Sequence, residues 1–549
     1  MNGEHLEPDV APGVWWARMR SHPYTWAVVA LSIVAHLVAL GLRPMAHDEA
    51  IDARFSWMAR AGGVIEYDPI YHGPLRFYLE GFVLNHFGIT PGWTRLVAAL
   101  AGIAATIVIA YSTRLLGRFG APFAALLFTI SPTVLTVTRT GREDSLTGLV
   151  SLALLLVIAN ALIEPKPRHI IGAGALLAVS FTLKETTFIF GLAGFVFFVG
   201  LVIQALRRRD RGAGSFFTRL GALGRQPWMW SFVAFVAIFL FVFTSAFRYG
   251  KGFKSGLVDG IEYWWSQHDV RRGSQRWFFY ATIYVGYEWL VIGAATIGLV
   301  VTVRRRATPR SMIGAWFATM AIVQFAVYSW AGEKFAWLAL HPLIPAVLLG
   351  GLGGQALVER FRNRTDASPA RLRLAAAGMV VLAVGTAAIG LRPAITDGAD
   401  TRELLVTVQT TTSVPEIADR LADARAAGTL GPILIDERDS GSWPWAWYVQ
   451  GWNDIGYFTI DPTVALPAGY DAYIVSASTD PPPVPPGYTI ERFPLRGWWL
   501  PDYDNVTIGD IARWFVTRET WNERGTSDQY LIIRESADAA AQPAAAATG

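Results

Sequence analysis

Long apolar runs alternate with short polar segments over the first 391 residues of the chain. A helix that spans a bilayer needs about 20 mostly apolar residues. By this criterion eleven spans are predicted, at residues 24–42, 93–115, 121–137, 145–163, 170–183, 186–206, 228–247, 286–303, 311–330, 336–358 and 371–391. The pattern therefore predicts an α-helical polytopic membrane protein with a transmembrane domain at residues 24–391.

Basic residues predict the orientation of these spans. They are concentrated in alternate loops, which hold Arg18 and Arg20, Arg114 and Arg118, Lys166 and Arg168, Arg207 to Arg209, Arg304 to Arg306, and Arg360, Arg362 and Arg364. Loops rich in Lys and Arg stay on the cytoplasmic side of a membrane. We therefore expect a multi-pass protein of the plasma membrane, with a cytoplasmic N-terminal segment at residues 1–23 and an extracytoplasmic C-terminal segment.

The first outer loop, residues 43–92, is too long for a turn. Apolar residues recur with helical spacing at residues 51–59 and 75–86, which predicts helices that lie in the membrane interface. The alternative is a further span at residues 75–88. That span would move the arginine-rich loops to the outside, so the distribution of basic residues argues against it.

The composition changes after residue 392. Helical and strand patterns then alternate: helices are predicted at residues 414–427 and 511–521, and strands at residues 432–436, 473–476 and 530–534. We therefore expect an extracytoplasmic α/β domain at residues 392–537. The low-complexity tail at residues 538–549 is expected to be disordered.

Composition narrows the possible classes of function. Hydrophobic residues make up 52% of the 549 residues and charged residues 16%, which is too apolar for an ordinary soluble protein. The net charge of +4 does not indicate nucleic-acid binding, because membrane topology explains the basic loops. The absence of cysteine excludes disulfides, thiolate nucleophiles and cysteine metal sites.

Four charged clusters stand at the ends of apolar runs, and the predicted topology places all of them on the outer face. They are His47-Asp48-Glu49, Arg142-Glu143-Asp144, Lys184-Glu185 and Glu333-Lys334. A charged side chain at a bilayer boundary costs free energy unless it is solvated, paired with an opposite charge or part of a functional site. These clusters therefore predict one functional site. The alternative is structural: aspartates that cap helices, and lysines that reach the interface beside paired glutamates.

Several short motifs resemble the GT-C superfamily of membrane glycosyltransferases, which includes protein O-mannosyltransferases and aminoarabinose transferases that act on lipid A. Asp48-Glu49 follows the first span directly, and Tyr71-His72-Gly73-Pro74-Leu75 is similar to the superfamily's His-Pro-Pro-Leu, with Gly73 in place of the first proline. The other matching features are Arg95-Leu96, Ser131-Pro132 and the cluster Arg142 to Asp144. The resemblance covers about the first 200 residues and implies a GT-C-like fold.

The whole chain is most similar to a prokaryotic branch known as flippase-activity-associated proteins. The features that carry this similarity are Gly332-Glu333-Lys334 and Ser442-Trp443-Pro444-Trp445, in addition to the motifs of the first 200 residues.

The resemblance implies that a sugar is transferred with inversion from a polyprenyl-phosphate donor to an extracytoplasmic lipid, glycan or protein acceptor. Asp48 is then the catalytic base, and Glu49 orients it or the acceptor. Cationic side chains at the boundary are expected to neutralise the donor phosphate: Arg142, Lys184 and Lys334. Residues expected to position the acceptor or the base are His47, His72, Glu143, Asp144 and Glu333.

Two other classes of function stay open. One is a lipid-linked sugar translocase or its accessory protein, and the other is a non-catalytic sugar-binding or assembly protein. Transporters carry ionisable groups near the midplane, whereas these predicted spans are nearly free of charge, which favours an enzyme. Asp48, Glu49 and Asp144 are conceivable ligands of a divalent ion, but they show no recognisable metal-ligand spacing, so no cofactor is predicted.

Overall fold

The computed structural model describes residues 23–207, 213–266, 270, 273, 275–304, 309–362, 369–396, 398–406 and 408–541. These residues form two compact units. The membrane unit runs up to Leu40 and from Ala59 to Thr396, and the sheet unit joins Gly41–Met58 to the chain from residue 398 onward. The sequence pattern predicts residues 43–92 as a loop of the membrane domain, whereas in the structure Gly41–Met58 group with the C-terminal domain.

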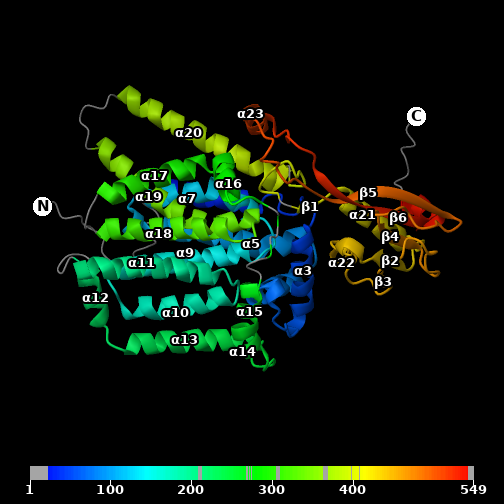
Figure 1. Ribbon diagram of the computed structural model, residues 1–549, viewed down its shortest axis with the longest axis horizontal. Helices are drawn as coiled ribbons and strands as arrows, with labels where there is room; N and C mark the ends of the chain where they lie inside the picture. Colours follow the sequence, from blue (N-terminus) through cyan, green and yellow to red (C-terminus); the bar gives the residue numbers. More distant parts are fainter. Residues whose placement is uncertain are drawn as a thin grey trace. The chain divides into compact units, whose positions relative to one another are not determined.

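Apolar helices make up the membrane unit (Figure 1). Among the described residues, seven helices are long and apolar enough to cross a membrane, or nine if each of two bent pairs is counted as one span, and two shorter helices are also apolar. Together these account for the eleven predicted segments. The helices that are not part of a bent pair are α2 (Pro23–Leu37), α5 (Pro91–Ala110), α9 (Asp144–Ile163), α10 (Pro167–Phe181), α11 (Thr187–Arg207), α13 (Gln226–Phe243), α18 (Pro309–Trp330), α19 (Leu340–Arg362) and α20 (Pro369–Leu391).

The first span is shorter than the predicted 24–42, because two buried arginines bind the carbonyls at its end. Arg139 donates to Ala35 O at 2.7 Å and to Val38 O at 2.8 Å. Arg95 donates to Leu40 O at 3.0 Å. The last carbonyls of a helix have no partner within it, so these guanidinium groups stabilise a chain that leaves the helix after Leu37.

Two predicted spans are bent. Residues 121–137 form α7 (Gly120–Ile130) and α8 (Pro132–Thr138), which meet at 65°. Residues 286–303 form most of α17 (Trp289–Arg304), which meets α16 (Phe279–Tyr287) at 102°.

Hydrogen bonds between residues at the two bends stabilise both of them. Ser131 precedes Pro132, caps α8 through Val134 N at 3.1 Å and donates to Glu288 Oε1 at 2.8 Å. Glu288 also accepts from Thr133 N at 2.9 Å, so a carboxylate at one bend satisfies a backbone N–H and a hydroxyl at the other.

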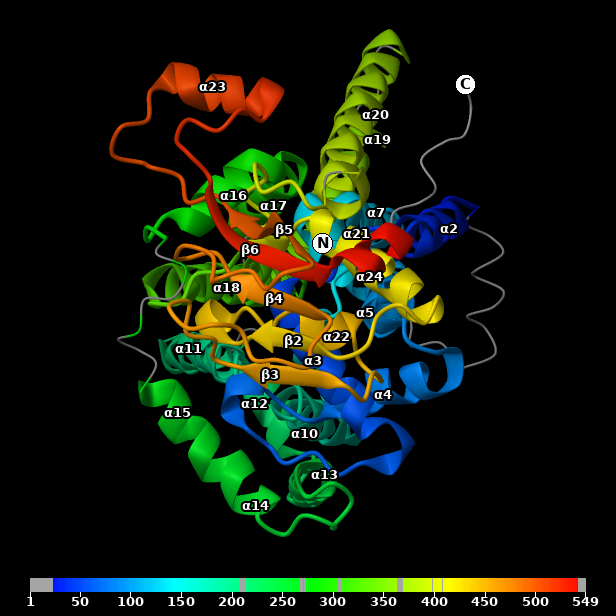
Figure 2. The same cartoon turned by 90° about the vertical axis from the view of Figure 1, so that its right-hand side faces the viewer.

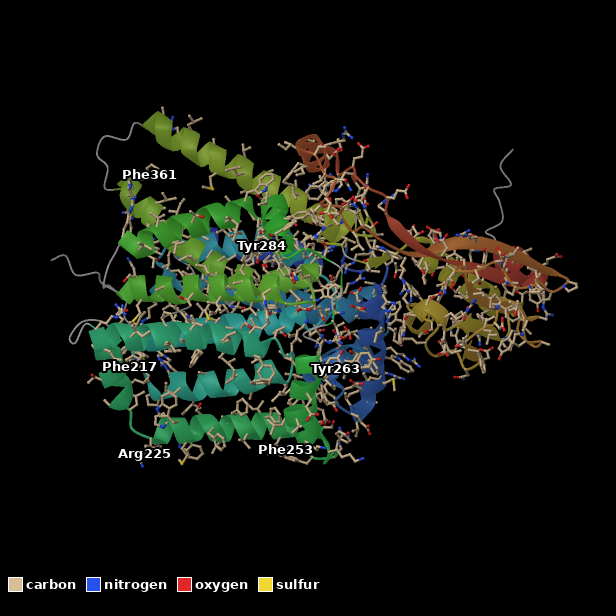
Figure 3. The ribbon with its side chains drawn as sticks, viewed as in Figure 1. Phe217, Arg225, Phe253, Tyr263, Tyr284 and Phe361 are labelled. Atoms are coloured by element: carbon tan, nitrogen blue, oxygen red, sulfur yellow. The ribbon has the colours of Figure 1, made fainter. Side chains whose placement is uncertain are left out.

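The two helices predicted in the first outer loop are present, as α3 (His47–Ala59) and α4 (Leu75–Phe87). Four shorter helices complete the membrane unit: α6 (Thr113–Leu116), α12 (Ala213–Gly221), α14 (Gly252–Lys254) and α15 (Gly260–Ser266). Figure 3 shows that Phe217 on α12 and Arg225, just before α13, lie at the same end of the helix bundle.

A six-stranded sheet forms the core of the sheet unit (Figure 2). The strand order is β1-β5-β6-β4-β2-β3. β2 pairs in parallel with β3 and β4, while β6 is antiparallel to both β4 and β5. The strands are β1 (Val408–Thr410), β2 (Ile433–Asp436), β3 (Ile455–Phe458), β4 (Ala472–Ser476), β5 (Tyr488–Trp498) and β6 (Gly525–Arg534), and the helices are α21 (Ser413–Ala426), α22 (Trp445–Tyr448), α23 (Ile508–Thr517) and α24 (Glu535–Ala541).

The predicted α/β character is confirmed, with differences in detail. The predicted helix at residues 511–521 lies at Ile508–Thr517, because Thr507 and Asp510 form a capping box at its start and Arg518 adopts a left-handed conformation at its end. Helix α24 includes residues 538–541, the first part of the tail expected to be disordered. Residues 542–549 lie outside the described residues.

Packing explains why Gly41–Met58 belongs to the sheet unit. Met45, Ala50 and Ala53 are buried together with Trp447 of α22. In addition, Gln409 in β1 donates its side-chain amide to Pro44 O at 3.0 Å. The start of α3 is therefore held by side chains more than 360 residues away in the sequence.

Candidate functional site

A buried network of charges occupies one end of the membrane unit, where α9 begins and the chain turns from α10 into α11. The Lys184 amine donates to Glu143 Oε1 and to Asp144 Oδ1, each at 2.7 Å. The three side chains are 3%, 1% and 0% exposed. The structure therefore brings together two of the four predicted clusters through direct ion pairs.

His72 joins this network from the loop before α4. Its Nδ1 lies 2.8 Å from Glu185 Oε2, and its Nε2 lies 3.5 Å from Glu143 Oε1. Tyr67 donates its hydroxyl to Glu185 Oε1 at 2.7 Å. Glu185, the neighbour of Lys184, thus connects the His72 loop to the turn between α10 and α11.

Gly73 allows this loop to approach α10 closely. Its N–H donates to Leu183 O at 3.1 Å, and a Cβ built on Gly73 would lie 2.1 Å from Thr182 O. No other residue fits at such a backbone contact without displacing it. The glycine that replaces the proline of the superfamily motif therefore fixes where His72 lies.

Arg142 is the most exposed of the three arginine and lysine side chains that contact Glu143, at 10%. Its guanidinium lies 4.6 Å from the ring centroid of Trp337 and 3.3 Å from Glu143 Oε1. Trp337 follows the predicted Glu333-Lys334 cluster, so the loop after α18 reaches the network. Planar guanidinium groups stacked on aromatic rings are well suited to bind phosphate.

Glu333 and Lys334 take part less directly. The Lys334 amine donates to Ala331 O, and its side chain is buried. Tyr280 lies within electrostatic range of both Glu333 and Asp144. The role predicted for Lys334 at the phosphate stays a prediction.

Sequence reasoning missed two members of the network. Arg76 donates to Gly141 O at 3.1 Å and lies 3.9 Å from Glu143 Oε2. His341 in α19 lies 3.2 Å from Asp144 Oδ1 and stacks on Tyr328. Arg76 had a signal in its spacing of four residues from Glu80 on the same predicted helix, and His341 had one as an ionisable residue inside an apolar run.

Electrostatics keep the network ionised. Burial alone would raise the pKa of Glu143, but the charges of Arg142 and Lys184 outweigh it and hold this pKa well below its ordinary value. Burial would lower the pKa of Lys184, yet the carboxylates of Asp144 and Glu143 raise it. Glu143 and Lys184 therefore stay charged, and neither is suited to exchange a proton during a reaction.

His72 should make stability depend on pH. Burial would lower its pKa, but Glu143 and Glu185 raise it above the ordinary value of 6.5. A raised pKa contributes stability that is complete below pH 6.5 and is lost as pH rises through the raised value. We expect the wild type to melt at a higher temperature than His72→Gln. This difference should be largest at low pH and should shrink in alkaline buffer. Thermal unfolding of both proteins across pH tests this, and a difference independent of pH would contradict it.

The predicted residues His47, Asp48 and Glu49 form a second group, in the first turn of α3 in the sheet unit. Glu49 is fully buried; its Oε2 accepts from Ala46 N at 3.2 Å and its Oε1 lies 3.8 Å from Arg43. Asp48 is only half-buried. Of the two carboxylates, Asp48 is the one that is partly exposed to solvent, whereas Glu49 fixes the start of the helix.

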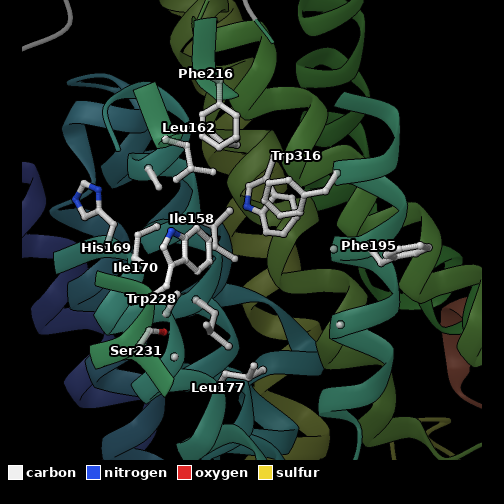
Figure 4. Close-up of a pocket in the computed structure, with 18 of the residues that line it drawn as sticks. Ile158, Leu162, His169, Ile170, Leu177, Phe195, Phe216, Trp228, Ser231 and Trp316 are labelled. Carbon is white, nitrogen blue, oxygen red and sulfur yellow. The ribbon is translucent and has the colours of Figure 1, made fainter. Parts of the chain in front are cut away.

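An apolar cavity of about 530 Å³ lies within the membrane unit (Figure 4). Helices α9, α10, α11, α12, α13 and α18 line it, and Phe216 and Trp316 project into it. His169 and Ser231 are its polar side chains. The remaining lining is aliphatic, aromatic or glycine, which suits a hydrocarbon chain better than a polar ligand.

Comparison with known proteins identifies one matching family and several structures of similar fold. Residues 71–243 match the model of the dolichyl-phosphate-mannose-protein mannosyltransferase family. The fold is similar to ArnT from Cupriavidus metallidurans bound to undecaprenyl phosphate, with a TM-score of 0.54 and 19% identity over 81% of this chain and 86% of that one. The structure of the same ArnT in the apo state is similar with a TM-score of 0.52 and 17% identity, over 80% of this chain and 85% of that one.

The arabinosyltransferase EmbB from Mycobacterium smegmatis gives a TM-score of 0.41 and 14% identity over 65% of this chain and 32% of that one. No curated protein matches. The similarity to the flippase-activity-associated branch stays a prediction. The family match and the ArnT structures confirm the predicted fold: this chain is a multi-pass membrane protein with a GT-C fold, and residues 71–243 match the model of the mannosyltransferase family.

Proposed function

We propose that this protein transfers a sugar, with inversion, from a polyprenyl-phosphate donor to an acceptor on the extracytoplasmic side of the plasma membrane. The observation that carries the proposal is the ionised network of His72, Glu143, Asp144 and Lys184. All four residues lie within the segment that matches the mannosyltransferase family. The ArnT structure with undecaprenyl phosphate supports a donor of the same lipid class.

In the proposed reaction, Asp48 takes the proton of the acceptor hydroxyl. The acceptor oxygen attacks the anomeric carbon from the side opposite the phosphate, and the bond between that carbon and the phosphate oxygen breaks. The polyprenyl phosphate leaves with the bonding electrons, so negative charge develops on its oxygens. Arg142 and Lys334 neutralise that charge, which is the main source of acceleration in such a step.

Lys184 has a different proposed role. Its amine is committed to Glu143 and Asp144, so it holds these carboxylates in place. Glu143 in turn holds Arg142 beside Trp337. Cationic side chains supply the charge neutralisation in this scheme, which assigns no step to a metal ion.

The apolar cavity suits the isoprenoid tail of the donor. Gly191 of α11 lines it, and a Cβ at Gly191 would meet nothing within 4 Å. We expect Gly191→Phe to fill the cavity and raise the KM for a long-chain donor about tenfold, which corresponds to roughly 1.4 kcal/mol. Kinetics with long-chain and short-chain polyprenyl-phosphate sugars measure the effect, and the short-chain donor should be affected much less.

Gly200→Phe is the matched control. Gly200 lies on the same helix with equally open surroundings but does not belong to the cavity lining. Equal effects of the two substitutions, or no effect of Gly191→Phe, would contradict the assignment of the tail.

A deletion strain tests the function in the cell. Without this protein, one surface glycolipid, glycan or glycoprotein should lose the mass of a sugar, and the unused polyprenyl-phosphate sugar should accumulate on the outer leaflet. Mass spectrometry of envelope fractions gives both readouts, and the wild-type gene should restore them. Accumulation of the donor on the inner leaflet would instead indicate a translocase.

A further inference from the structure

His47 is bound by an arginine from the C-terminal sheet. Arg496 in β5 places its NH1 2.8 Å from His47 Nδ1 and donates through NH2 to Asp439 O. The pairing of β5 with β6 shifts register between Pro494 and Arg496. Bulges of this kind re-aim a side chain and are common beside active sites.

This contact fixes the protonation of the imidazole. A guanidinium has only donors and does not lose its proton in proteins. The His47 Nδ1 must therefore accept with its lone pair, and a neutral imidazole then carries its proton on Nε2. Burial supports the same state by lowering the pKa of His47, and Arg496 lowers it further against the raising effect of Asp48.

We propose that Arg496 is a positioning residue that holds His47 in the neutral Nε2–H form beside Asp48, so that His47 donates a hydrogen bond to a substrate oxygen while Asp48 accepts the proton of the acceptor. The inference rests on the proposed function, in which Asp48 is the base. It gives strand β5 a role in positioning the group next to the proposed base.

The surrounding charges are consistent with this role. Asp48 lies next to His47 on α3, and Arg496 approaches from β5. Asp439, in the loop after β2, supplies the carbonyl that accepts from Arg496, and its carboxylate accepts from Ser476 Oγ at 2.8 Å. Asp439 and Ser440 both have positive φ, at 55° and 56°. Such backbone strain persists where the surrounding structure imposes it, often at functional sites.

The pH dependence of kcat/KM tests the proposal. In Arg496→Met, His47 loses the contact that keeps Nδ1 unprotonated, so its pKa should rise toward the ordinary value of 6.5. An imidazolium beside Asp48 would then stabilise the carboxylate and weaken it as a base. We expect the acid limb of the profile to move to higher pH, and Arg496→Lys, which keeps a cationic donor, to retain most of the wild-type profile.

The double variant His47→Gln with Arg496→Met shows whether Arg496 acts through the protonation of His47 or only stabilises the fold. Glutamine retains a side-chain N–H but does not titrate, so the shift of the acid limb should disappear in the double variant. A shift that persists there, or no shift in Arg496→Met, would overturn the proposal.

Nitrogen NMR of labelled histidine provides a readout independent of activity. The signal lost in His47→Gln should be that of a neutral ring with an unprotonated Nδ1 in the wild type. A protonated Nδ1 would contradict the inference even if Asp48→Asn abolishes transfer. Conversely, full activity of Asp48→Asn would overturn the proposed function while leaving the NMR assignment of His47 intact.

Discussion

Replacing Lys184 by methionine should destabilise the membrane unit by about 3–5 kcal/mol, the usual cost of removing one partner from a buried ion pair. Methionine keeps much of the length of lysine but not its charge. Glu143 and Asp144 would then lie 1% and 0% exposed without the amine that now binds both at 2.7 Å. Thermal unfolding of the detergent-purified protein, followed by size-exclusion chromatography, measures the loss.

Two further variants show whether charge is the cause. Lys184→Arg keeps a cation and should cost much less than Lys184→Met. Adding Glu143→Gln and Asp144→Asn to Lys184→Met removes the buried negative charges and should recover a large part of the lost stability. If Lys184→Met alone unfolds at the wild-type temperature, the proposed ionised network is wrong.

Replacing Asp48 by asparagine should lower the rate of sugar transfer by about 10²–10⁴-fold, the usual contribution of a general base. Asparagine preserves the shape of the side chain but cannot take the acceptor proton. Asp48 is half-buried in the first turn of α3, so the substitution should leave the melting temperature nearly unchanged. Initial rates at saturating donor measure the effect on kcat.

Glu66→Gln is the matched control for Asp48→Asn. Glu66 is an exposed carboxylate between α3 and α4, and its loss should change the rate less than twofold, a small effect beside that expected for a base. The assignment of the base would be wrong if Asp48→Asn kept most of the activity while Glu49→Gln, at the buried neighbour, abolished it without unfolding the protein.

Local signals in the sequence predicted much of this fold. Each predicted span is a continuous apolar run, so the eleven segments could be located one at a time. Alternating topology then predicted that the four charged clusters lie on one face, and in the structure Lys184 of one cluster binds Glu143 and Asp144 of another. The bends at Ser131 and Glu288 were missed because a kink leaves the hydropathy of a segment unchanged.

Contacts between distant parts of the chain could not be predicted in the same way. Strand β5 contains Pro494 and Gly497, residues that argue against a strand, and it forms because β6 pairs with its full length. The place of α3 in the sheet unit depends on Trp447, about 400 residues away. Arg496 reaches His47 only once that packing exists, so no single-sequence pattern could have revealed their hydrogen bond.

The most direct measurement of the central claim follows both products of transfer by the purified protein in sealed vesicles. The vesicles contain a polyprenyl-phosphate-linked sugar and an acceptor extract from the deletion strain. The account predicts that wild-type protein releases free polyprenyl phosphate and glycosylated acceptor in equal amounts, and that Asp48→Asn releases neither. Movement of the intact donor across the bilayer at equal rates in both proteins, without any free polyprenyl phosphate, would contradict it.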